Sequence, residues 1–145
     1  MIWRIYYGLL ALLGPLALLA LRLVLNPLLR NKRVRVVLLH PDGRVLLVVN
    51  ALGDRKWTLP GGGATRRETL VEAAIRELHE ELGIVLLRRT LTHLGEVEVS
   101  GYKAPLFAVQ LNQLQVEQIT PDKFEIYDTQ WCDVHELPSG AQPII

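Results

Sequence analysis

Residues 62–84 read GGATRRETLVEAAIRELHEELGI, and this stretch decides the fold of the chain. Its apolar residues recur at the three- and four-residue spacing of one helical face. They are Leu70, Val71, Ala74, Ile75, Leu78 and Leu82. The segment Thr65-Arg66-Arg67-Glu68 has the form of a capping box, and Gly83 is well placed to end a helix. The spacing therefore predicts a helix over about residues 66–82.

Three acidic residues lie on one side of this predicted helix, beside its apolar stripe: Glu77, Glu80 and Glu81. Like charges at these spacings repel one another, so the helix is mildly destabilised unless a cation lies among them. Carboxylates without a neighbouring thiolate or imidazole suit Mg²⁺ or Mn²⁺. Arg76 can hold one of them by charge-assisted hydrogen bonds. The group predicts a divalent-cation site.

A solvated acidic face is the better interpretation of a glutamate pair that stands alone. Here the residues from Gly62 to Ile84 satisfy the whole pattern G-x5-E-x7-R-E-U-x-E-E-x-G-U, where U is a bulky aliphatic residue. The chain therefore resembles the Nudix hydrolase family, whose Nudix box has this pattern, over roughly residues 33–138. The approach to the box, Trp57-Thr58-Leu59-Pro60-Gly61-Gly62, is also similar to that of the family.

The resemblance implies an α/β fold, namely an α/β/α sandwich around a mixed sheet, with Mg²⁺ or Mn²⁺ as the cofactor. It implies hydrolysis of a nucleoside diphosphate linked to another moiety. The implied metal ligands are Glu80, Glu81, Glu77 and the carbonyl group of Gly61. Arg76 would orient the glutamates, and Glu77 would serve as a further ligand or as the base. The implied substrate-binding residues are Gly62, Gly63, Glu68 and Arg66.

Other candidate site residues have competing interpretations. A general base in such enzymes often lies outside the box, and Glu125 is the first candidate, with Glu96 and Glu98 behind it; surface charge is the alternative for each. Arg66 is either a contact for an anionic substrate or a plain surface residue. Tyr102 is placed where an aromatic ring could stack on a base, but a strand tyrosine more often belongs to the core or its rim.

Leucine-rich, β-branched runs outside the box predict strands. Residues 34–40 and 44–50 flank Pro41-Asp42-Gly43 and so predict a hairpin. Residues 57–59 predict a short extended piece. Further strands are expected at about residues 90–99, 102–111 and 124–134, and a loop at residues 112–122. Family members commonly have a helix after a segment like residues 131–138, so we expect one outer helix to be shortened or missing.

Residues 5–25 are apolar, and their first charge is Arg22. A membrane-spanning helix needs roughly 17 to 25 residues, so the segment predicts a single-pass anchor in a lipid bilayer. A cleaved signal peptide and a monotopic or core-packed helix are the alternatives. The predicted division is an anchor at residues 1–30 and a Nudix domain at residues 31–145.

Basic residues are more frequent after the apolar segment than before it. Arg4 precedes it, and Arg30, Lys32, Arg33 and Arg35 follow it. The positive-inside bias therefore predicts that the Nudix domain faces the cytoplasm. The alternative for these basic residues is an ordinary solvated linker, or contact with anionic lipid headgroups.

The composition excludes several classes of protein. The chain has 145 residues, a single cysteine and a formal net charge of +1. Its length favours one modest globular domain, and its near-neutral charge argues against DNA as a partner.

Two alternatives to a pyrophosphohydrolase are a noncatalytic nucleotide-binding module with the same fold and a membrane protein whose soluble part only scaffolds partners. The box does not define what lies beyond the second phosphate.

Overall fold

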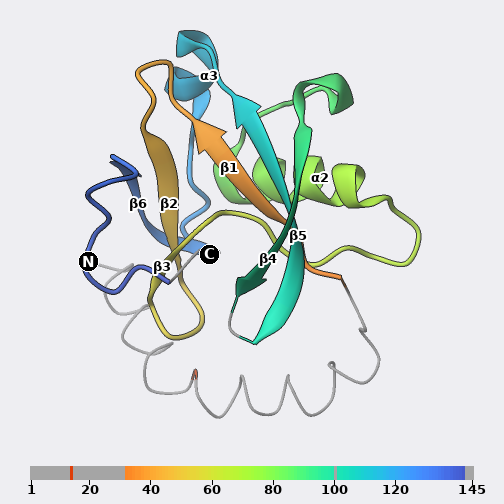
Figure 1. Ribbon diagram of the computed structural model, residues 1–145, viewed down its shortest axis with the longest axis horizontal. Helices are drawn as coiled ribbons and strands as arrows, with labels where there is room; N and C mark the ends of the chain where they lie inside the picture. The colour runs from red at the N-terminus through yellow and green to blue at the C-terminus, as the bar shows by residue number, and fades with distance from the viewer. Residues whose placement is uncertain (1–13, 15–31, 100, 143–145) are drawn as a thin grey trace.

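The computed structural model describes residue 14, residues 32–99 and residues 101–142 (Figure 1). In chain order the elements are β1 (Arg35–Leu39), β2 (Val45–Asn50), β3 (Trp57–Thr58), α2 (Leu70–Leu82), the 3₁₀ turn η1 (Arg88–Thr90), β4 (Thr92–Val99), β5 (Tyr102–Gln110), α3 (Gln113–Gln118) and β6 (Ile126–Cys132). Every strand predicted from the sequence is present, because each β-branched run supplies a strand with a buried side. The hairpin prediction is confirmed as β1 and β2.

A mixed sheet organises the domain. Its strand order is β3-β2-β1-β5-β4, and β6 pairs with β2 off this path. Strands β1 and β5 run parallel with Arg35 opposite Leu106, whereas the other strand pairs are antiparallel. The predicted α/β class with a mixed sheet is therefore confirmed.

The β1/β2 hairpin opens beyond its turn, and the glycine loop fills the opening. The two strands are registered at Leu39 and Val45, close to the turn. Further along β1, the Val36 N–H donates to the Pro60 carbonyl at 3.0 Å and the Val34 N–H to the Gly62 carbonyl at 2.8 Å. The loop that precedes α2 is thus hydrogen-bonded to β1 as a further strand would be, which fixes its glycines beside the sheet.

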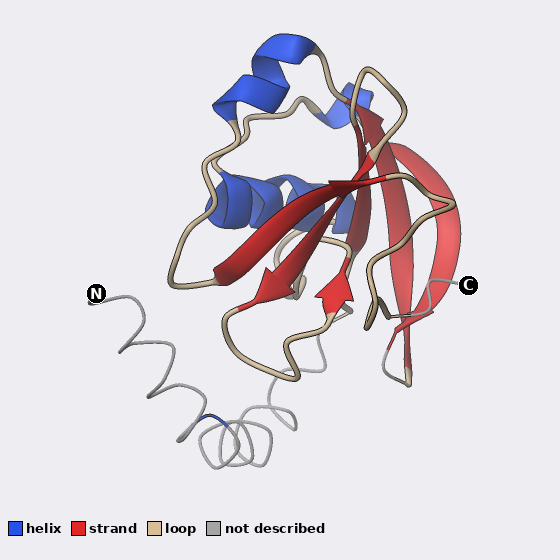
Figure 2. Ribbon diagram, turned by 90° about the vertical axis from the view of Figure 1, so that its left-hand side faces the viewer, coloured by secondary structure: helices blue, strands red, loops and turns tan. Residues whose placement is uncertain are grey.

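Helix α2 covers one face of the sheet (Figures 1 and 2). Leu78 and Leu82 are fully buried there with Val36 of β1 and Val34, which directly precedes that strand. Burial of such a side chain contributes about 1.5–3 kcal/mol, so this stripe fixes which side of α2 meets the sheet. The other face of the sheet carries a smaller buried cluster of Val45, Leu47, Leu59 and Cys132.

Helix α2 begins later than predicted. Its N-cap is Thr69, whose side chain accepts from the Glu72 N–H while the Glu72 carboxylate accepts from the Thr69 N–H. The earlier candidate box forms only a turn, in which the Thr65 N–H donates to the Glu68 carboxylate. The sequence offers two capping boxes in succession, and the first is not used because Arg76 also binds Glu68. Gly83 ends the helix in a left-handed conformation, as predicted.

The loop predicted at residues 112–122 contains helix α3, so that prediction is wrong. Asn112 caps the helix through a reciprocal box with Gln115. Val116 and Ile119 pack against the main core beside α2. Because the helix is short, its periodicity is too brief to identify it, and packing with the cap stabilises it.

The predicted anchor at residues 5–25 lies outside the described residues, apart from residue 14. Within the part of the chain that the structure describes, no helix is long and apolar enough to cross a membrane. Helices α2 and α3 contact the same core cluster, so residues 32–99 and 101–142 show one helical layer rather than both layers of the predicted sandwich. Beyond β6, Ala141 forms a bridge with Trp57.

Candidate active site

Arg76 lies at the centre of the acidic group on α2. Its guanidinium donates to both carboxylate oxygens of Glu68 at 2.9 and 3.1 Å, to Glu77 at 3.0 Å and to Glu80 at 2.8 Å. It also donates to the carbonyl of Gly63 at 2.8 Å. These bonds lower the pKa of Glu68 to about 2, chiefly through the Arg76 hydrogen bonds. Arg76 therefore fixes the loop of the glycines to the helix, and it holds two of the three acids in place.

Glu81 is the buried member of the acidic group, with 6% of its surface exposed. Its carboxylate accepts from the Gly61 N–H at 2.9 Å. Burial raises its pKa to about 8, because the charged form loses water, and the nearby charge of Glu77 adds to this effect. A carboxylate in such a position is held at a cost unless a cation neutralises it.

Glu77 packs against the glycine loop. A Cβ atom at Gly62 would lie 2.3 Å from a carboxylate oxygen of Glu77, so a side chain at this position would displace the acid. Burial raises the pKa of Glu77 above its ordinary value, although the Arg76 hydrogen bond opposes this. The loop and the helix therefore meet at an acid that is partly removed from water.

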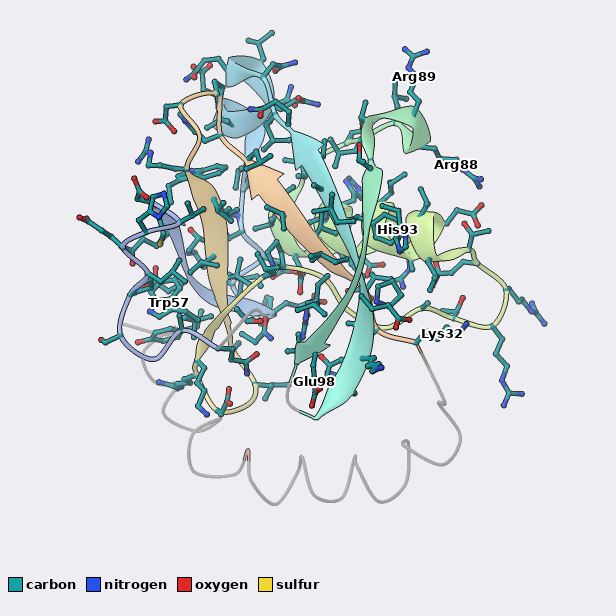
Figure 3. The ribbon with its side chains drawn as sticks, viewed as in Figure 1. Lys32, Trp57, Arg88, Arg89, His93 and Glu98 are labelled. Carbon is teal, nitrogen blue, oxygen red and sulfur yellow. The ribbon has the colours of Figure 1, made fainter. Side chains whose placement is uncertain are left out.

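Glu125 lies near the same acids, although it comes from the segment before β6. Its pKa is raised by burial and by the charges of Asp122 and Glu80. The Asp122 N–H donates to the Glu81 carbonyl at 2.9 Å, which attaches this segment to the end of α2. The alternative bases Glu96 and Glu98 are exposed on the edge strand β4, and Glu98 lies on the part that projects away from α2 (Figure 3).

The donor set fits a hard divalent cation. Glu77, Glu80 and Glu81 supply carboxylate oxygens from the same helix, and oxygen ligands of this kind suit Mg²⁺ and Mn²⁺. Within residues 32–99 and 101–142, however, no three acidic, histidine or cysteine side chains are already arranged as a metal site. Arg76 instead occupies an oxygen of Glu77 and one of Glu80. The residues fit the cation, and small side-chain rotations would be needed to bind it.

Comparison with known proteins gives the family. The family model described as NUDIX domain matches residues 29–144. This chain belongs to the Nudix hydrolase family. The sequence-based resemblance is therefore confirmed, and the Nudix box is the loop and helix that carry Gly62, Glu68 and the acids of α2.

Relatives by sequence and by structure agree with this assignment. Phosphatase NudJ of Escherichia coli K12 is 33% identical over 103 residues, which cover 68% of this chain and 65% of the relative, so the match spans less than two thirds of that protein. A MutT Nudix hydrolase from Burkholderia pseudomallei superposes with a TM-score of 0.64 at 23% identity, covering 77% of this chain and 88% of that one. A Caenorhabditis elegans Ap4A hydrolase gives a TM-score of 0.55 at 21% identity, covering 72% and 81%. The two solved structures show that the fold is shared.

The remaining predicted residues of the Nudix site have different surroundings from one another. Gly61 and Gly62 lie in the loop beside β1, close to Glu81 and Glu77 respectively. Arg66 is exposed on the turn before α2. The Gly61 carbonyl, predicted as a metal ligand, accepts a hydrogen bond from Arg35 at 2.7 Å. A carbonyl oxygen has two lone pairs, so this bond leaves one for a cation.

Sequence reasoning missed the place of Arg35 in this Nudix domain. It was grouped with the basic residues that follow the apolar segment, but its side chain is 5% exposed within β1. A solvated linker or a lipid contact is therefore the wrong interpretation for this residue. The available signal was its position inside a run of valine and leucine, where a charged side chain is rarely buried without a partner.

Proposed function

We propose that this chain hydrolyses the pyrophosphate bond of a nucleoside diphosphate linked to another moiety, with Mg²⁺ or Mn²⁺ as cofactor. Members of the Nudix hydrolase family act on pyrophosphate bonds of nucleotide derivatives. The observation that carries the proposal is the clustering of Glu77, Glu81 and Glu125 with other acids, because the pKa of each is raised by burial and by the charges of neighbouring carboxylates. Acids crowded in this way favour a divalent cation, and a pyrophosphate brings the phosphate oxygens that complete its coordination.

The surroundings of each residue indicate its role in the proposed reaction. A bound cation would neutralise the pyrophosphate oxygens and lower the pKa of the attacking water. Glu80 and Glu81 provide carboxylates from adjacent positions of α2, and Arg76 restricts the orientation of Glu80 through its hydrogen bond. The loop of Gly61 and Gly62 lets the backbone approach the phosphates, because neither residue carries a Cβ atom.

Glu125 is the general base in this proposal. Water attacks phosphorus, the bond from that phosphorus to the bridging oxygen breaks, and the proton of the water passes to a carboxylate. Glu125 suits this role because it is exposed, lies near Glu80 and has a raised pKa, so it binds a proton more readily than an ordinary glutamate. Glu77 is hydrogen-bonded to Arg76, which makes it the poorer acceptor.

The first experiment is a panel of nucleotide pyrophosphates offered to the full 145-residue chain in mild detergent. The panel contains sugar nucleotides, ADP-ribose, dinucleoside polyphosphates, oxidised nucleotides and capped RNA. We expect product release with Mg²⁺ or Mn²⁺, none with a chelator, and a loss of about a thousandfold in Glu80→Gln, because a metal ligand is removed. Glu117→Gln is the matched control, since Glu117 is exposed on α3 and bonds to Gln113.

Other outcomes decide against the proposal. Turnover that survives Glu80→Gln would contradict the metal site. Nucleotide binding by calorimetry without turnover of any panel member would favour the noncatalytic module. The panel includes ADP-ribose and a dinucleoside tetraphosphate because two proteins share the fold: a bifunctional NMN adenylyltransferase/ADP ribose pyrophosphatase from Francisella tularensis and the Caenorhabditis elegans Ap4A hydrolase.

We place the domain at the cytoplasmic face of a membrane, with residues 5–25 as a single-pass anchor. The support is the length and apolarity of that segment and the basic residues after it. We expect the chain to sediment with membranes, to resist an alkaline wash and to be released by detergent. Protease added to intact cells should leave the domain undigested, and it should digest the domain once the cells are broken open. Recovery of the whole protein in the soluble fraction would refute the anchor.

A further inference from the structure

Two charged side chains are buried in the described part of the chain, and both bond to the same glycine. They are Arg35, 5% exposed, and Glu81, 6% exposed. The Arg35 Nη1 donates to the Gly61 carbonyl at 2.7 Å, and the Gly61 N–H donates to the Glu81 carboxylate at 2.9 Å. Gly61 therefore connects a buried cation on β1 to a buried acid on α2.

Tyr102 provides the second support for Arg35. The Arg35 Nη2 donates to the Tyr102 hydroxyl at 2.9 Å, across the parallel pairing of β1 and β5. The ring of Tyr102 in turn lies beneath the guanidinium of Arg33, 5.3 Å from its centre. The planar guanidinium of Arg35 is thus held at two of its nitrogens by groups on two different segments.

Burial of the Arg35 guanidinium is unfavourable for the stability of the fold. Its two acceptors are uncharged and its Nε has no partner, so its hydrogen bonds do not fully replace the water that it has lost. Val37 and Leu39 point to the same face of β1 and contribute to its apolar cluster. A further apolar residue at position 35 would therefore be the better choice for stability alone.

The glycine between the two charges is free to rotate unless something holds it. Gly61 has φ +130°, a region that side-chain-bearing residues rarely adopt, and glycine reaches many other conformations as easily. The Gly61 N–H shares a peptide plane with the Pro60 carbonyl, which accepts from the Val36 N–H at 3.0 Å. The Arg35 bond fixes the Gly61 carbonyl, which lies in the following peptide plane, so the two bonds together leave Gly61 a single conformation between them. As a result, the N–H that Glu81 accepts from keeps one direction.

We propose that Arg35 is a positioning residue of the metal site: acting through Gly61, and supported by Tyr102, it holds the Glu81 carboxylate in the orientation that binds the cation. The proposal rests on the proposed metal-dependent function. Residues that orient metal ligands from outside typically change metal affinity about 10- to 100-fold when altered.

Variants that retain the positive charge at position 35 show the effect of the hydrogen-bond geometry alone. The charge of Arg35 acts on Glu81 and would also repel a cation, so its removal has two opposite effects on metal binding. Arg35→Lys keeps the charge and loses the planar fork. Tyr102→Phe keeps both the charge and the ring, and it removes only the hydroxyl that accepts from Arg35. The matched control is Arg89→Lys, because Arg89 is exposed on η1, away from Gly61 and Tyr102 (Figure 3).

The experiment measures Mn²⁺ binding by isothermal titration calorimetry on the full chain in mild detergent, together with kcat and KM for the substrate found in the panel. We expect Arg35→Lys and Tyr102→Phe to weaken Mn²⁺ binding about tenfold or more and to lower kcat with little change in KM. Arg89→Lys should leave all three quantities unchanged. Thermal unfolding of each variant in chelator shows whether it is folded, and Tyr102→Phe provides the test if Arg35→Lys unfolds.

The outcomes separate this proposal from the function on which it rests. Unaltered Mn²⁺ affinity and kcat in folded Tyr102→Phe and Arg35→Lys would overturn the role of Arg35 while the metal-dependent function stands. Equal weakening by Arg89→Lys would also overturn it, because a general effect of replacing an arginine would then explain the loss. No Mn²⁺ binding by the unsubstituted chain would overturn both proposals together.

Discussion

Glu81→Gln is expected to lower turnover about a thousandfold and, at the same time, to raise the stability of the metal-free protein. The side chain is buried, and its carboxylate accepts a single hydrogen bond from the Gly61 N–H. Glutamine keeps an oxygen for that N–H but carries no charge. The gain in the free energy of unfolding should be about 1–3 kcal/mol at pH 8, since an uncompensated buried charge is removed.

The pH dependence of this gain has a definite sign. The pKa of Glu81 rises from an ordinary 4.5 to about 8 on folding. The folded protein therefore binds this proton more tightly than the unfolded chain, and the resulting stabilisation is fully present below pH 4.5 and is lost as the pH rises toward 8. Glutamine resembles the protonated acid, so the variant and the unsubstituted chain should differ little near pH 5 and most near pH 8.

Thermal unfolding in chelator across this pH range measures the effect. In Mn²⁺ the order should reverse, because the unsubstituted chain gains stability from the cation and the variant does not. Glu117→Gln serves again as the exposed control and should change neither the unfolding temperature nor its pH dependence. A Glu81→Gln protein that is less stable than the unsubstituted chain at pH 8 would show that the charge is compensated in the folded state.

Gly61→Ala is expected to lower the free energy of unfolding by about 3 kcal/mol or more and to abolish turnover. The new Cβ atom would lie 2.4 Å from the Val34 carbonyl oxygen and 3.2 Å from the Arg35 Cα. Both are backbone atoms where β1 begins, and they cannot move aside without disturbing the sheet. The φ of +130° adds strain of its own. Any relief would displace the N–H that bonds to Glu81.

Gly43→Ala separates the effect of the steric clash from the effect of the positive φ. Gly43 lies in the hairpin turn with φ +93°, and a Cβ atom there would meet nothing within 4 Å. Its loss should be about 1 kcal/mol, because only the backbone conformation is disfavoured. The comparison requires the free energy of unfolding of Gly61→Ala and Gly43→Ala, measured in denaturant, and the turnover of each variant's folded fraction. Equal losses would show that the contact with β1 is not tight, and the assignment of Gly61 to the interior of the site would fail.

The Nudix box could be located from the sequence because its information is local. Glu77, Glu80 and Glu81 are within one turn of each other on α2, and Arg76 is adjacent, so their common side follows from helical geometry alone. The hairpin was equally accessible, since Gly43 and its neighbours specify the turn and the runs beside it specify the strands. The metal-ligand and base assignments remain predictions that the geometry supports.

Errors arose where one local signal competed with another or was too short. Thr65 and Thr69 both head a capping box, and the long-range bond from Arg76 to Glu68 leaves the second box to begin the helix. The six residues of α3 are fewer than two turns, so packing of Val116 and Ile119 rather than periodicity identifies them. Both differences come from contacts that local pattern does not contain.

By itself, the sequence determined the family, the helix with its acids and the apolar stripe that turns the helix toward a sheet, because these properties repeat within a few residues. Only the tertiary structure decided what surrounds the acids. Parallel pairing of β1 with β5 brings Arg35 to Tyr102 over 67 residues of sequence, and the opened hairpin brings Gly61 to Glu81. Burial at these meeting points raises the pKa of Glu81, and burial is a property of the packed molecule, which no residue has alone.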